Sequence, residues 1–594
     1  MPNNEVDFNT IENKIIELVI GLELDGRVFK FRPGQLEAVT SIVCNAMNNV
    51  KHTLLEAPTG SGKSMIGILA AYALYKLFNK KSYILVSDLS LYKQYEDDLV
   101  RFDADAFGQI HTEQMFGCIK GKENYTCWKN SCSANQAACS LQGMSVNGTM
   151  RNYYKFSCAH NCKYMQDYIK AIHAPITLMT YQLYFIQRNY VEDALFNGIN
   201  KNFPARDLVI CDECHKLCDI CQAHFAPTIS ISRPDWMNAI DKYLHNDSHE
   251  HVRAAIIHKM TMSDGDELMQ AISEYAGYVR RYVMDNETIR KRLAHRTALS
   301  KIERLALASG NRARQEHCKL DDMLSFIDEL KSSDYLVKTI NESTISLNFI
   351  FDDIMLKKYF HSKSKCEMLM SATIGNFGRY ASLNGLDKSS CKAISLPSTF
   401  DFSKSPIMFS SHNKMSYVEK NTSIANIAEQ ASAICKENDV VRGIIQTGSY
   451  ANTKALLEHL PKDVLDRCLI YNGAVEKRQM LDEFIERAKD PKDNSILVGP
   501  TLIEGLNFPD DVCRFQICIK VPYACLGSEY VKKKMQYVPG WYEYDVLNKL
   551  CQGIGRGIRH EHDWCKTYIL DGCISYLVSK LEKFSTLNGR FRKF

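Results

Sequence analysis

The chain has 594 residues, of which 45% are hydrophobic and 24% are charged, and its formal net charge is +4. This composition excludes an intrinsically disordered chain and leaves enough apolar material for several buried cores. At about 150 residues per domain, the length predicts roughly four domains. The net charge is too small to indicate a nucleic-acid partner by itself, so any basic groove must arise from local arrangement.

The cysteine content is the unusual feature of the composition. A chain of this size does not need disulfide bonds to stabilise a core, yet it has 22 cysteines. Its first residues are polar and acidic, unlike a secretion signal, and its longest apolar stretch, at 65–78, is shorter than a membrane span and contains a lysine. We therefore expect a cytoplasmic or nuclear protein without membrane association, whose cysteines are thiols or metal ligands.

In chain order, the first elements indicate an α/β nucleotide-binding domain. Short apolar runs at 53–56, 82–87 and 207–211 have the length of buried strands in a parallel sheet. The stretch 63–78 follows the first of these runs and has helical periodicity. A strand, a Gly-rich loop and a helix in succession are typical of this fold class.

Two segments interrupt this pattern. A window at 118–162 is rich in Asn, Ser, Gly and Lys, so apolar packing alone would not stabilise it. Its six cysteines are Cys118, Cys127, Cys132, Cys139, Cys158 and Cys162. From about 233 to 360, long Glu/Lys/Arg/Ala/Leu-rich runs favour an inserted helical domain. The α/β alternation then returns, with strands expected at 441–446, 496–499, 513–520 and 566–571.

The sequence APTGSGKS at 57–64 is the strongest single motif. Backbone N–H groups of such a loop at a helix N-terminus bind phosphates, Lys63 would neutralise the β/γ charge, and Ser64 would supply a hydroxyl to Mg²⁺. The strict pattern begins with Gly, where this chain has Ala57. The predicted nucleotide-binding residues of the loop are Ala57, Pro58, Thr59, Gly60, Ser61, Gly62, Lys63 and Ser64.

The sequence VICDECH at 209–215 supplies the acidic pair that a nucleotide site requires. Asp212 would hold Mg²⁺ through water, and Glu213 would polarise the attacking water. The same segment contains two CxxC pairs, a pattern that also suggests zinc. Only three residues separate the pairs, and a metal there would pull the acidic pair from the nucleotide, so packing is favoured for Cys211, Cys214, Cys218 and Cys221.

The third motif is QGIGRGIR at 552–559. Gln552, Arg556 and Arg559 have the spacing to face the phosphates from a second α/β domain. An arginine in that place stabilises the charge that develops in phosphoryl transfer. These three residues, together with Lys63 and the acidic pair, are the predicted catalytic set.

Together these motifs resemble the superfamily 2 DNA helicases of the XPD/DinG type, which carry an iron–sulfur cluster. RPGQ at 32–35 resembles the early Gln motif of this family, which implies that Gln35 contacts adenine. In the segment 499–511, which resembles motif V of the family, Asn507 stands where Asp is usual. In the acidic box at 209–215, Cys214 replaces the usual Ala. The other resemblances are VSDLSLYKQ at 86–94, SAT at 371–373, GIIQTGSY at 443–450, GPTLIEGLNFPDD at 499–511 and DWCKTYILD at 563–571.

The resemblance implies an α/β protein with two RecA-like motor domains and inserted iron–sulfur and helical arch domains. It implies an ATP-dependent DNA helicase that uses ATP and Mg²⁺, moves 5′→3′ on single-stranded DNA, acts on fork structures and works in DNA repair. The expected boundaries are 1–110, 173–230 and 363–400 for motor domain 1, 111–172 for the iron–sulfur domain, 231–362 for the arch and 401–594 for motor domain 2.

Within the cysteine window, KGKENYTC at 120–127 and FSCAHNCKY at 156–164 resemble the family segments that hold the cluster. By this resemblance, Cys127, Cys158 and Cys162 are candidate ligands of a [4Fe–4S] cluster. The fourth ligand is Cys139 or Cys132; Cys139 is preferred because similar sequences place the second ligand well beyond the first. Zinc is the competing occupant, since four cysteines suit both metals. Cys118 is expected to be a packed thiol.

Two other classes of function remain open from the sequence. An ATP-driven translocase could remodel protein–nucleic-acid complexes without separating strands. The other class is a zinc-containing nucleic-acid-binding module with a vestigial nucleotide site. Such a module would show no ATPase activity stimulated by single-stranded nucleic acid. A DinG-like nuclease is disfavoured, because the motor motifs begin by residue 32.

Overall fold

The structure is a computed structural model. It describes residues 7–20, 22–24, 27–58, 60–106, 115–129, 131–143, 161–189, 195–196, 199–200, 203–247, 249–293, 296, 299–398, 401–471, 473–500, 508–555, 562–579 and 590–593. Among these residues, none of the helices combines the length and the apolar character needed to cross a membrane.

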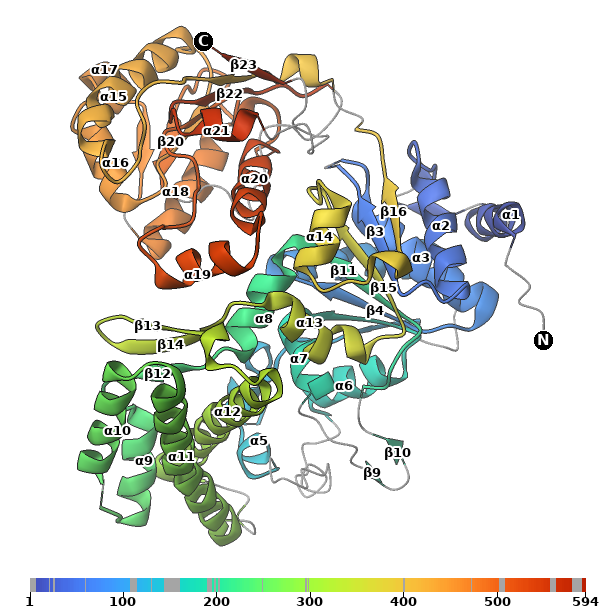
Figure 1. Ribbon diagram of the computed structural model, residues 1–594. Coiled ribbons are helices and arrows are strands. Elements are labelled where there is room, and N and C mark those ends of the chain that lie inside the picture. The colour runs from blue at the N-terminus through green and yellow to red at the C-terminus, as the bar shows by residue number, and fades with distance from the viewer. Residues whose placement is uncertain are drawn as a thin grey trace.

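A parallel sheet of seven strands forms the centre of the first α/β domain (Figure 1). The strands predicted near 53–56, 82–87 and 207–211 are confirmed, as is the helix at 63–78, which is α3 (Lys63–Phe78). The order across the sheet is β16 (Cys391–Ser395), β3 (His52–Glu56), β15 (Cys366–Ser371), β11 (Leu208–Asp212), β4 (Ser82–Val86), β8 (Ile176–Thr180) and β5 (Phe116–Cys118).

Strand alternation divides the apolar residues of this sheet between two cores. Ile84 and Val86 contribute to one core with helices α2 (Gln35–Met47), α3 and α4 (Leu89–Ala106). Tyr83 and Leu85 point to the other core, which is covered by helices α6 (Lys163–His173), α7 (Tyr181–Asn189) and α8 (Leu217–Phe225). Because both faces are covered, the strands read as continuous apolar runs in the sequence.

The second α/β domain is built in the same way on another sheet of seven parallel strands, at the upper left of Figure 1. Four of its strands were predicted. The order is β19 (Cys468–Ile470), β20 (Ile496–Gly499), β18 (Gly443–Gln446), β21 (Phe515–Cys518), β22 (Lys566–Ile569), β17 (Ile407–Phe409) and β23 (Phe591–Lys593). Helices α15 (Lys420–Glu437), α16 (Tyr450–Leu457), α18 (Ala474–Arg487), α19 (Glu529–Tyr537) and α20 (Trp541–Ile554) belong to the same region.

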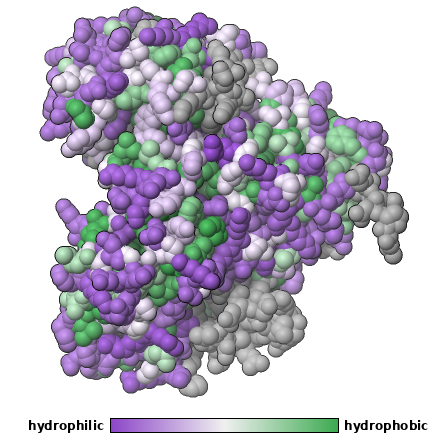
Figure 2. All heavy atoms as spheres, in the orientation of Figure 1, coloured by the Kyte–Doolittle hydropathy of each residue, from purple (hydrophilic) through white to green (hydrophobic). Residues whose placement is uncertain are grey.

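Between β11 and β15 the chain forms the helical insertion, residues 228–349, drawn in green to yellow-green in Figure 1. It contains helices α9 (Asp235–Leu244), α10 (Glu250–Met262), α11 (Gly265–Leu293) and α12 (Lys301–Leu330). It also contains a three-stranded antiparallel sheet in the order β12 (Thr228–Ser230), β14 (Thr344–Phe349) and β13 (Leu336–Ile340), which the sequence pattern did not indicate. The surface is hollowed between this insertion and the second α/β domain, with side chains of mixed hydropathy around the hollow (Figure 2).

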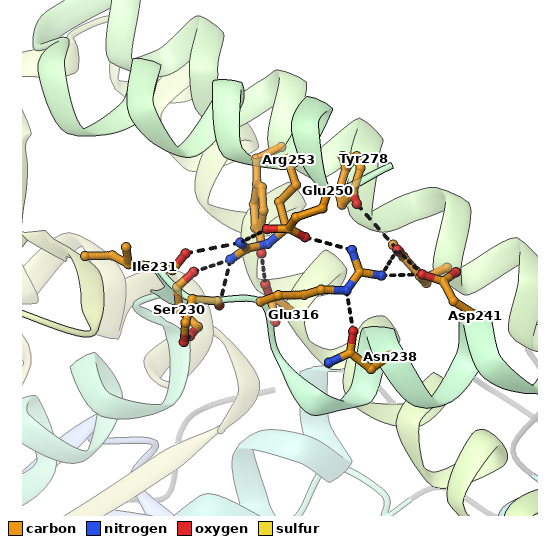
Figure 3. Close-up of polar contacts among 12 residues, drawn as sticks. Ser230, Ile231, Asn238, Asp241, Glu250, Arg253, Tyr278 and Glu316 are labelled. Carbon is orange, nitrogen blue, oxygen red and sulfur yellow. Dashed lines mark hydrogen bonds and ion pairs between the residues drawn. The ribbon is translucent and has the colours of Figure 1, made fainter. Parts of the chain in front are cut away.

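Two arginines fasten the start of the helical insertion (Figure 3). Arg253 of α10 is 1% exposed and donates to the backbone carbonyl groups of Ser230, Ile231 and Ser232. Arg233 donates to Glu250 Oε2 at 2.8 Å and also pairs with Asp241. The chain therefore leaves β12 through a segment whose backbone carbonyl groups accept hydrogen bonds from within the insertion.

Candidate functional site

The Gly-rich loop lies between the end of β3 and the start of α3, as the motif predicts. Gly60 and Gly62 have φ values of +84° and +78°, which favour glycine. A Cβ atom at Gly62 would lie 2.3 Å from Gln35 Nε2, so the position also has no room for a side chain. The loop thus brings backbone N–H groups to the N-terminus of a long helix, an arrangement that binds phosphate.

Gln35 holds this loop in place. Its side chain is buried, and its Nε2 donates to the carbonyl oxygen of Ser61 at 2.8 Å while its Oε1 accepts from the backbone N–H of Arg32, also at 2.8 Å. The Arg32 guanidinium donates to the carbonyl oxygen of Gly60. The sequence predicts an adenine contact for Gln35; the structure places its carboxamide on the loop itself.

The Ser61 hydroxyl oxygen is buried and makes no hydrogen bond to any described residue. A buried donor without a partner is costly unless a ligand satisfies it. Ala57, Pro58, Gly60, Lys63 and Ser64 occupy the loop and first helical turn as predicted, while Thr59 lies outside the described residues. The loop therefore fits a bound phosphate chain.

The acidic pair lies at the carboxyl end of β11, across from the loop. Lys63 Nζ is 3.7 Å from Glu213 Oε1. Asp212 is buried, and its carboxylate accepts hydrogen bonds from Tyr95 Oη and from the backbone N–H of Glu213, both at 2.8 Å. Burial, followed by repulsion from Glu213, raises the pKa of Asp212 to about 6, although Lys63 and Tyr95 act in the opposite direction.

Glu213 has a left-handed backbone, with φ of +53°. This conformation is uncommon for a residue other than glycine, and such strain persists where the surrounding structure enforces it. It turns the Glu213 carboxylate toward the loop, where it is 29% exposed. The arrangement places one buried and one accessible carboxylate beside the phosphate loop, which suits a metal ligand and a group that polarises water.

His215 links the acidic pair to the SAT motif. Its Nδ1 lies 2.8 Å from Ser371 Oγ and 3.2 Å from Glu213 Oε2. Ser371 Oγ also accepts from the backbone N–H of Thr373 at 3.2 Å. These contacts join the ends of two strands of the first sheet, β11 and β15, so a change at the acidic pair can move the segment that follows β15.

The second α/β domain contacts this segment through α20. Tyr544 Oη donates to the carbonyl oxygen of Ile374 at 2.7 Å, and Arg379 donates to the carbonyl oxygen of Pro539 at 2.7 Å. Gln552 lies half-buried near the end of α20, while Arg556 and Arg559 lie outside the described residues. The structure therefore places the helix that leads to the arginine motif against the SAT segment.

A buried ion pair provides another contact between the first and second α/β domains. Lys534 Nζ of α19 donates to Asp352 Oδ2 at 2.5 Å, and both side chains are less than a tenth exposed. Gln222 of α8 donates to the other carboxylate oxygen at 2.8 Å. Burial acts against the charged form of Lys534, but Asp352 raises its pKa above the ordinary value. Helix α8 follows the acidic box, so this pair connects the box to the second domain.

In the cysteine window, Cys127 and Cys132 are register partners in the hairpin of β6 (Thr126–Cys127) and β7 (Cys132–Ser133). Cys139 lies on α5 (Ala138–Gly143), and Cys162 precedes α6. Tyr125 packs edge-to-face against Tyr164 at 5.4 Å.

This ring contact brings the segments of Cys127 and Cys162 together. Among the described residues, the cysteines of the window form no disulfide bond, and Cys158 lies outside the described residues. Cys118 is partly buried and packs against the first core, as expected for a packed thiol, and burial raises its pKa to about 12. The thiols that the structure describes are suitable in kind for a cluster of iron and sulfide.

Among the residues that the structure describes, the four cysteines of the double CxxC at 211–221 do not converge into a group that could hold a metal ion. Cys211, Cys214 and Cys221 are buried in the apolar core, and Cys218 packs against it. Burial raises the pKa of each of these thiols. The prediction of packing is confirmed.

Sequence reasoning missed one residue of the site. Tyr95 on α4 forms a buried hydrogen bond with Asp212, 117 positions away in the chain. The only signal was its place just after the VSDLSLYKQ motif. A tyrosine in a helix is more often a core residue, and its partner is set by the pairing of β11 with β4.

Comparison with known families agrees with both halves of the fold. Residues 28–247 match the family model described as the res subunit of type III restriction enzymes, and residues 431–579 match the helicase C-terminal domain. A solved XPD helicase has the same fold with a TM-score of 0.58 at 14% identity, covering 95% of this chain and 100% of that one. An apo XPD structure has a TM-score of 0.55 at 14% identity, covering 94% and 100%.

Among curated proteins, the chain is 21% identical to the probable ATP-dependent helicase MJ0942 of Methanocaldococcus jannaschii, over 89% of this chain and 90% of that protein. The ATP-dependent DNA helicase DDX11 of Mus musculus is 32% identical over 13% of this chain and 10% of that protein. The ATP-dependent DNA helicase CHL1 of Vanderwaltozyma polyspora is 32% identical over 15% of this chain and 13% of that protein, so these two matches are local.

Two RecA-like parallel sheets with an assembled phosphate loop and acidic box define an ATP-dependent helicase. Within that class, the chain is similar in sequence to curated helicases that include CHL1 and DDX11, and it shares the fold of XPD. The resemblance inferred from the motifs is thereby confirmed.

Proposed function

We propose that this protein is a DNA helicase that translocates 5′→3′ on single-stranded DNA and unwinds duplexes at forks. The observation that carries the proposal is the convergence of the phosphate loop, the acidic pair and the SAT serine on one end of the first sheet, with Lys63 3.7 Å from Glu213. The names of the relatives support DNA as the nucleic acid. The polarity comes from the family resemblance.

In this function ATP binds between the two RecA-like domains. Lys63 neutralises the β/γ-phosphates, Glu213 orients the attacking water, and Ser64 and Asp212 would hold Mg²⁺, which supplies charge stabilisation when bound. From the second domain, Arg556 and Arg559 stabilise the developing charge, with Gln552 beside them.

ATP binding and release open and close the cleft between the domains. We infer that the Lys534–Asp352 pair and the contact of Tyr544 with Ile374 transmit this motion from one domain to the other. Single-stranded DNA is held through phosphate contacts and base stacking, neither of which requires a particular sequence. This suits a motor that moves along any strand.

For the cysteine window we propose a [4Fe–4S] cluster held by Cys127, Cys158, Cys162 and either Cys139 or Cys132. Support for Cys132 comes from its place opposite Cys127 in the hairpin, and support for Cys139 from the resemblance. The cluster would supply a structural staple for a loop-rich segment. Iron and acid-labile sulfide in the purified protein would agree with it, whereas stoichiometric zinc without iron would refute it.

The test of the proposed function is an unwinding assay on duplexes with 5′ or 3′ single-stranded tails. We expect ATP-dependent unwinding of the 5′-tailed duplex. Lys63→Ala should abolish both ATP hydrolysis and unwinding while the fold is retained, and Lys489→Ala, at an exposed ion pair, is the matched control. ATPase activity without strand separation would instead identify a remodelling translocase, and normal hydrolysis by Lys63→Ala would refute the site.

A further inference from the structure

The amino ends of β3 and β15, opposite the nucleotide site, hold a second group of polar side chains that the proposed function does not use. His52 is the first residue of β3, and its register partner on β15 is Glu367. His361 comes from the short helix that precedes β15. The three residues are 4%, 0% and 6% exposed. Groups of this polarity are buried only when partners compensate for the lost water.

Both imidazole rings direct Nδ1 toward the same carboxylate oxygen. Glu367 Oε2 lies 2.7 Å from Nδ1 of His361 and 3.2 Å from Nδ1 of His52. Ligand atoms around a tetrahedral ion with bonds of about 2.0–2.1 Å are about 3.3 Å apart. Within the part of the chain that the structure describes, no other group of three His, Cys, Asp or Glu side chains converges this closely.

The hydrogen bond on the far side of His361 fixes the proton on its ring. Nε2 lies 2.9 Å from the carbonyl oxygen of Asn384, which can only accept, so Nε2 carries a hydrogen. In the neutral ring, the lone pair of Nδ1 then faces the carboxylate of Glu367, and two lone pairs at this distance need a cation between them. A proton on Nδ1 would satisfy His361 alone, with His52 donating its own Nδ1 hydrogen to the same oxygen. A metal ion serves both rings and the carboxylate.

This outer contact also matches the usual environment of a metal-bound histidine, whose second ring nitrogen donates to a carbonyl or carboxylate group. The other oxygen of Glu367, Oε1, accepts from the Ser364 hydroxyl and lies 4.0 Å from Lys51 Nζ. Lys51 is itself held by the carbonyl oxygens of His361 and Ser364. Oε2 is therefore the oxygen that remains for a metal.

No sulfur belongs to this group. Cys391 is the register partner of His52 on β16, but its thiol donates to the carbonyl oxygen of Asp387 at 3.1 Å. The donor set is two imidazole nitrogens and one carboxylate oxygen. Mg²⁺ and Ca²⁺ prefer oxygen ligands, whereas Zn²⁺ commonly takes this mixed set.

We propose that His52, His361 and Glu367 bind one divalent transition-metal ion, with Zn²⁺ as the best match. The ion joins β3 to β15 at their amino ends. At their carboxyl ends, the same strands are in register at Glu56 and Ser371, next to the phosphate loop and the SAT segment. The site therefore fixes the two strands that deliver nucleotide-site residues, and it is separate from the cysteine window.

The first measurement is the metal content of the full-length chain, purified from zinc-replete cells without chelators, with zinc and iron counted separately. We expect about one zinc per chain, and X-ray absorption at the zinc edge should show only nitrogen and oxygen neighbours. Absence of zinc, or a first shell of sulfur, would overturn the proposal.

Single substitutions test which side chains bind the zinc. His361→Gln and His52→Gln should lose zinc while the iron content stays constant. His317→Gln is the control histidine, since His317 pairs with Asp321 on α12, and Cys391→Ser tests the neighbouring thiol. Both controls should keep their zinc. Zinc retained by His361→Gln would contradict the assignment.

A measurement on the unmodified protein covers the case in which the variants fail to fold. The wild-type chain is treated with a chelator, and its thermal unfolding is followed before and after addition of Zn²⁺ or Mg²⁺. We expect the unfolding midpoint to fall on chelation and to recover with Zn²⁺ alone, while iron is unchanged. A midpoint that responds to neither treatment would show that a proton, not a metal, lies between His361 and Glu367.

Discussion

The strands β3 and β15 carry polar residues at both ends. The two ends differ in backbone strain and in whether the buried polar groups have hydrogen-bond partners. At the carboxyl end, the phosphate loop contains left-handed glycines, Glu213 has a strained backbone, and the Ser61 hydroxyl is buried without a partner. At the amino end, Glu367 is fully buried, and its carboxylate has partners on both oxygens.

This difference separates ligand binding from stability. Buried polar groups without a partner are costly to the folded state, whereas a buried carboxylate with a partner on each oxygen holds its neighbours in one arrangement. Changes to the side chains that would contact the ligand at the carboxyl end should therefore reduce activity with little effect on stability. Changes at the amino end should reduce stability first.

The largest expected effect belongs to Glu213→Gln. Because this change removes the carboxylate that orients the water, we expect kcat for ATP hydrolysis to fall by about 10³-fold. The unfolding midpoint should stay constant, since Glu213 is partly exposed and repels the buried Asp212. Glu486→Gln, at an exposed ion pair, is the control. A large loss of stability in Glu213→Gln would contradict the division between the two ends.

Glu367→Gln should have the opposite effect, with a loss of stability in place of a direct loss of ATP hydrolysis. It removes the buried carboxylate that pairs with Lys51 and that the proposed ion would join to His52 and His361, and we expect a loss of about 3 kcal/mol in the free energy of unfolding. Thermal unfolding measures this loss. The matched control is Glu329→Gln, whose exposed pair with Lys358 should contribute less than about 1 kcal/mol. Equal stability of the two variants would show that the amino end is not the rigid one.

Gly62→Ala tests the phosphate loop with a change of one methyl group. The left-handed backbone makes Ala unfavourable by about 1–2 kcal/mol, and the new Cβ displaces Gln35 from the loop. Nucleotide affinity should fall. Gly277→Ala is the control, since this helical glycine has open space and alanine should stabilise it by about 0.5–1 kcal/mol. Unaltered nucleotide binding by Gly62→Ala would rule out the role given to Gln35.

The smallest expected effect is a pH dependence at His224, on the helix that follows the acidic box. Burial, with a contribution from Lys319, lowers the pKa of His224 from 6.5 to about 4. Below pH 6.5 the unfolded chain gains a proton that the folded chain does not, so stability falls as the pH drops toward 4.

His224→Phe keeps the ring beside Phe185 and Phe225 and removes the titration. Between pH 7 and pH 5.5, the wild-type protein should lose about 1 kcal/mol more than the variant. Urea unfolding at several pH values measures the difference. Parallel pH profiles for the two proteins would contradict the buried, neutral state of His224.

The sequence by itself determined the local elements of the nucleotide site. A Gly-rich turn, an apolar strand before it and a helical period after it are short-range patterns, so α3 and the strands β3, β4 and β11 were predictable. The acidic pair followed from its place at a strand end. The double CxxC was separated from a metal site because its spacing is too short.

Tertiary structure alone decided which distant residues meet. His52 and Glu367 are 315 positions apart, and only the parallel register of β3 with β15 places them side by side. The same holds for Tyr95 with Asp212 and for Lys534 with Asp352. Local sequence patterns do not encode register between strands separated by large insertions, because register is set by packing on both faces of the completed sheet.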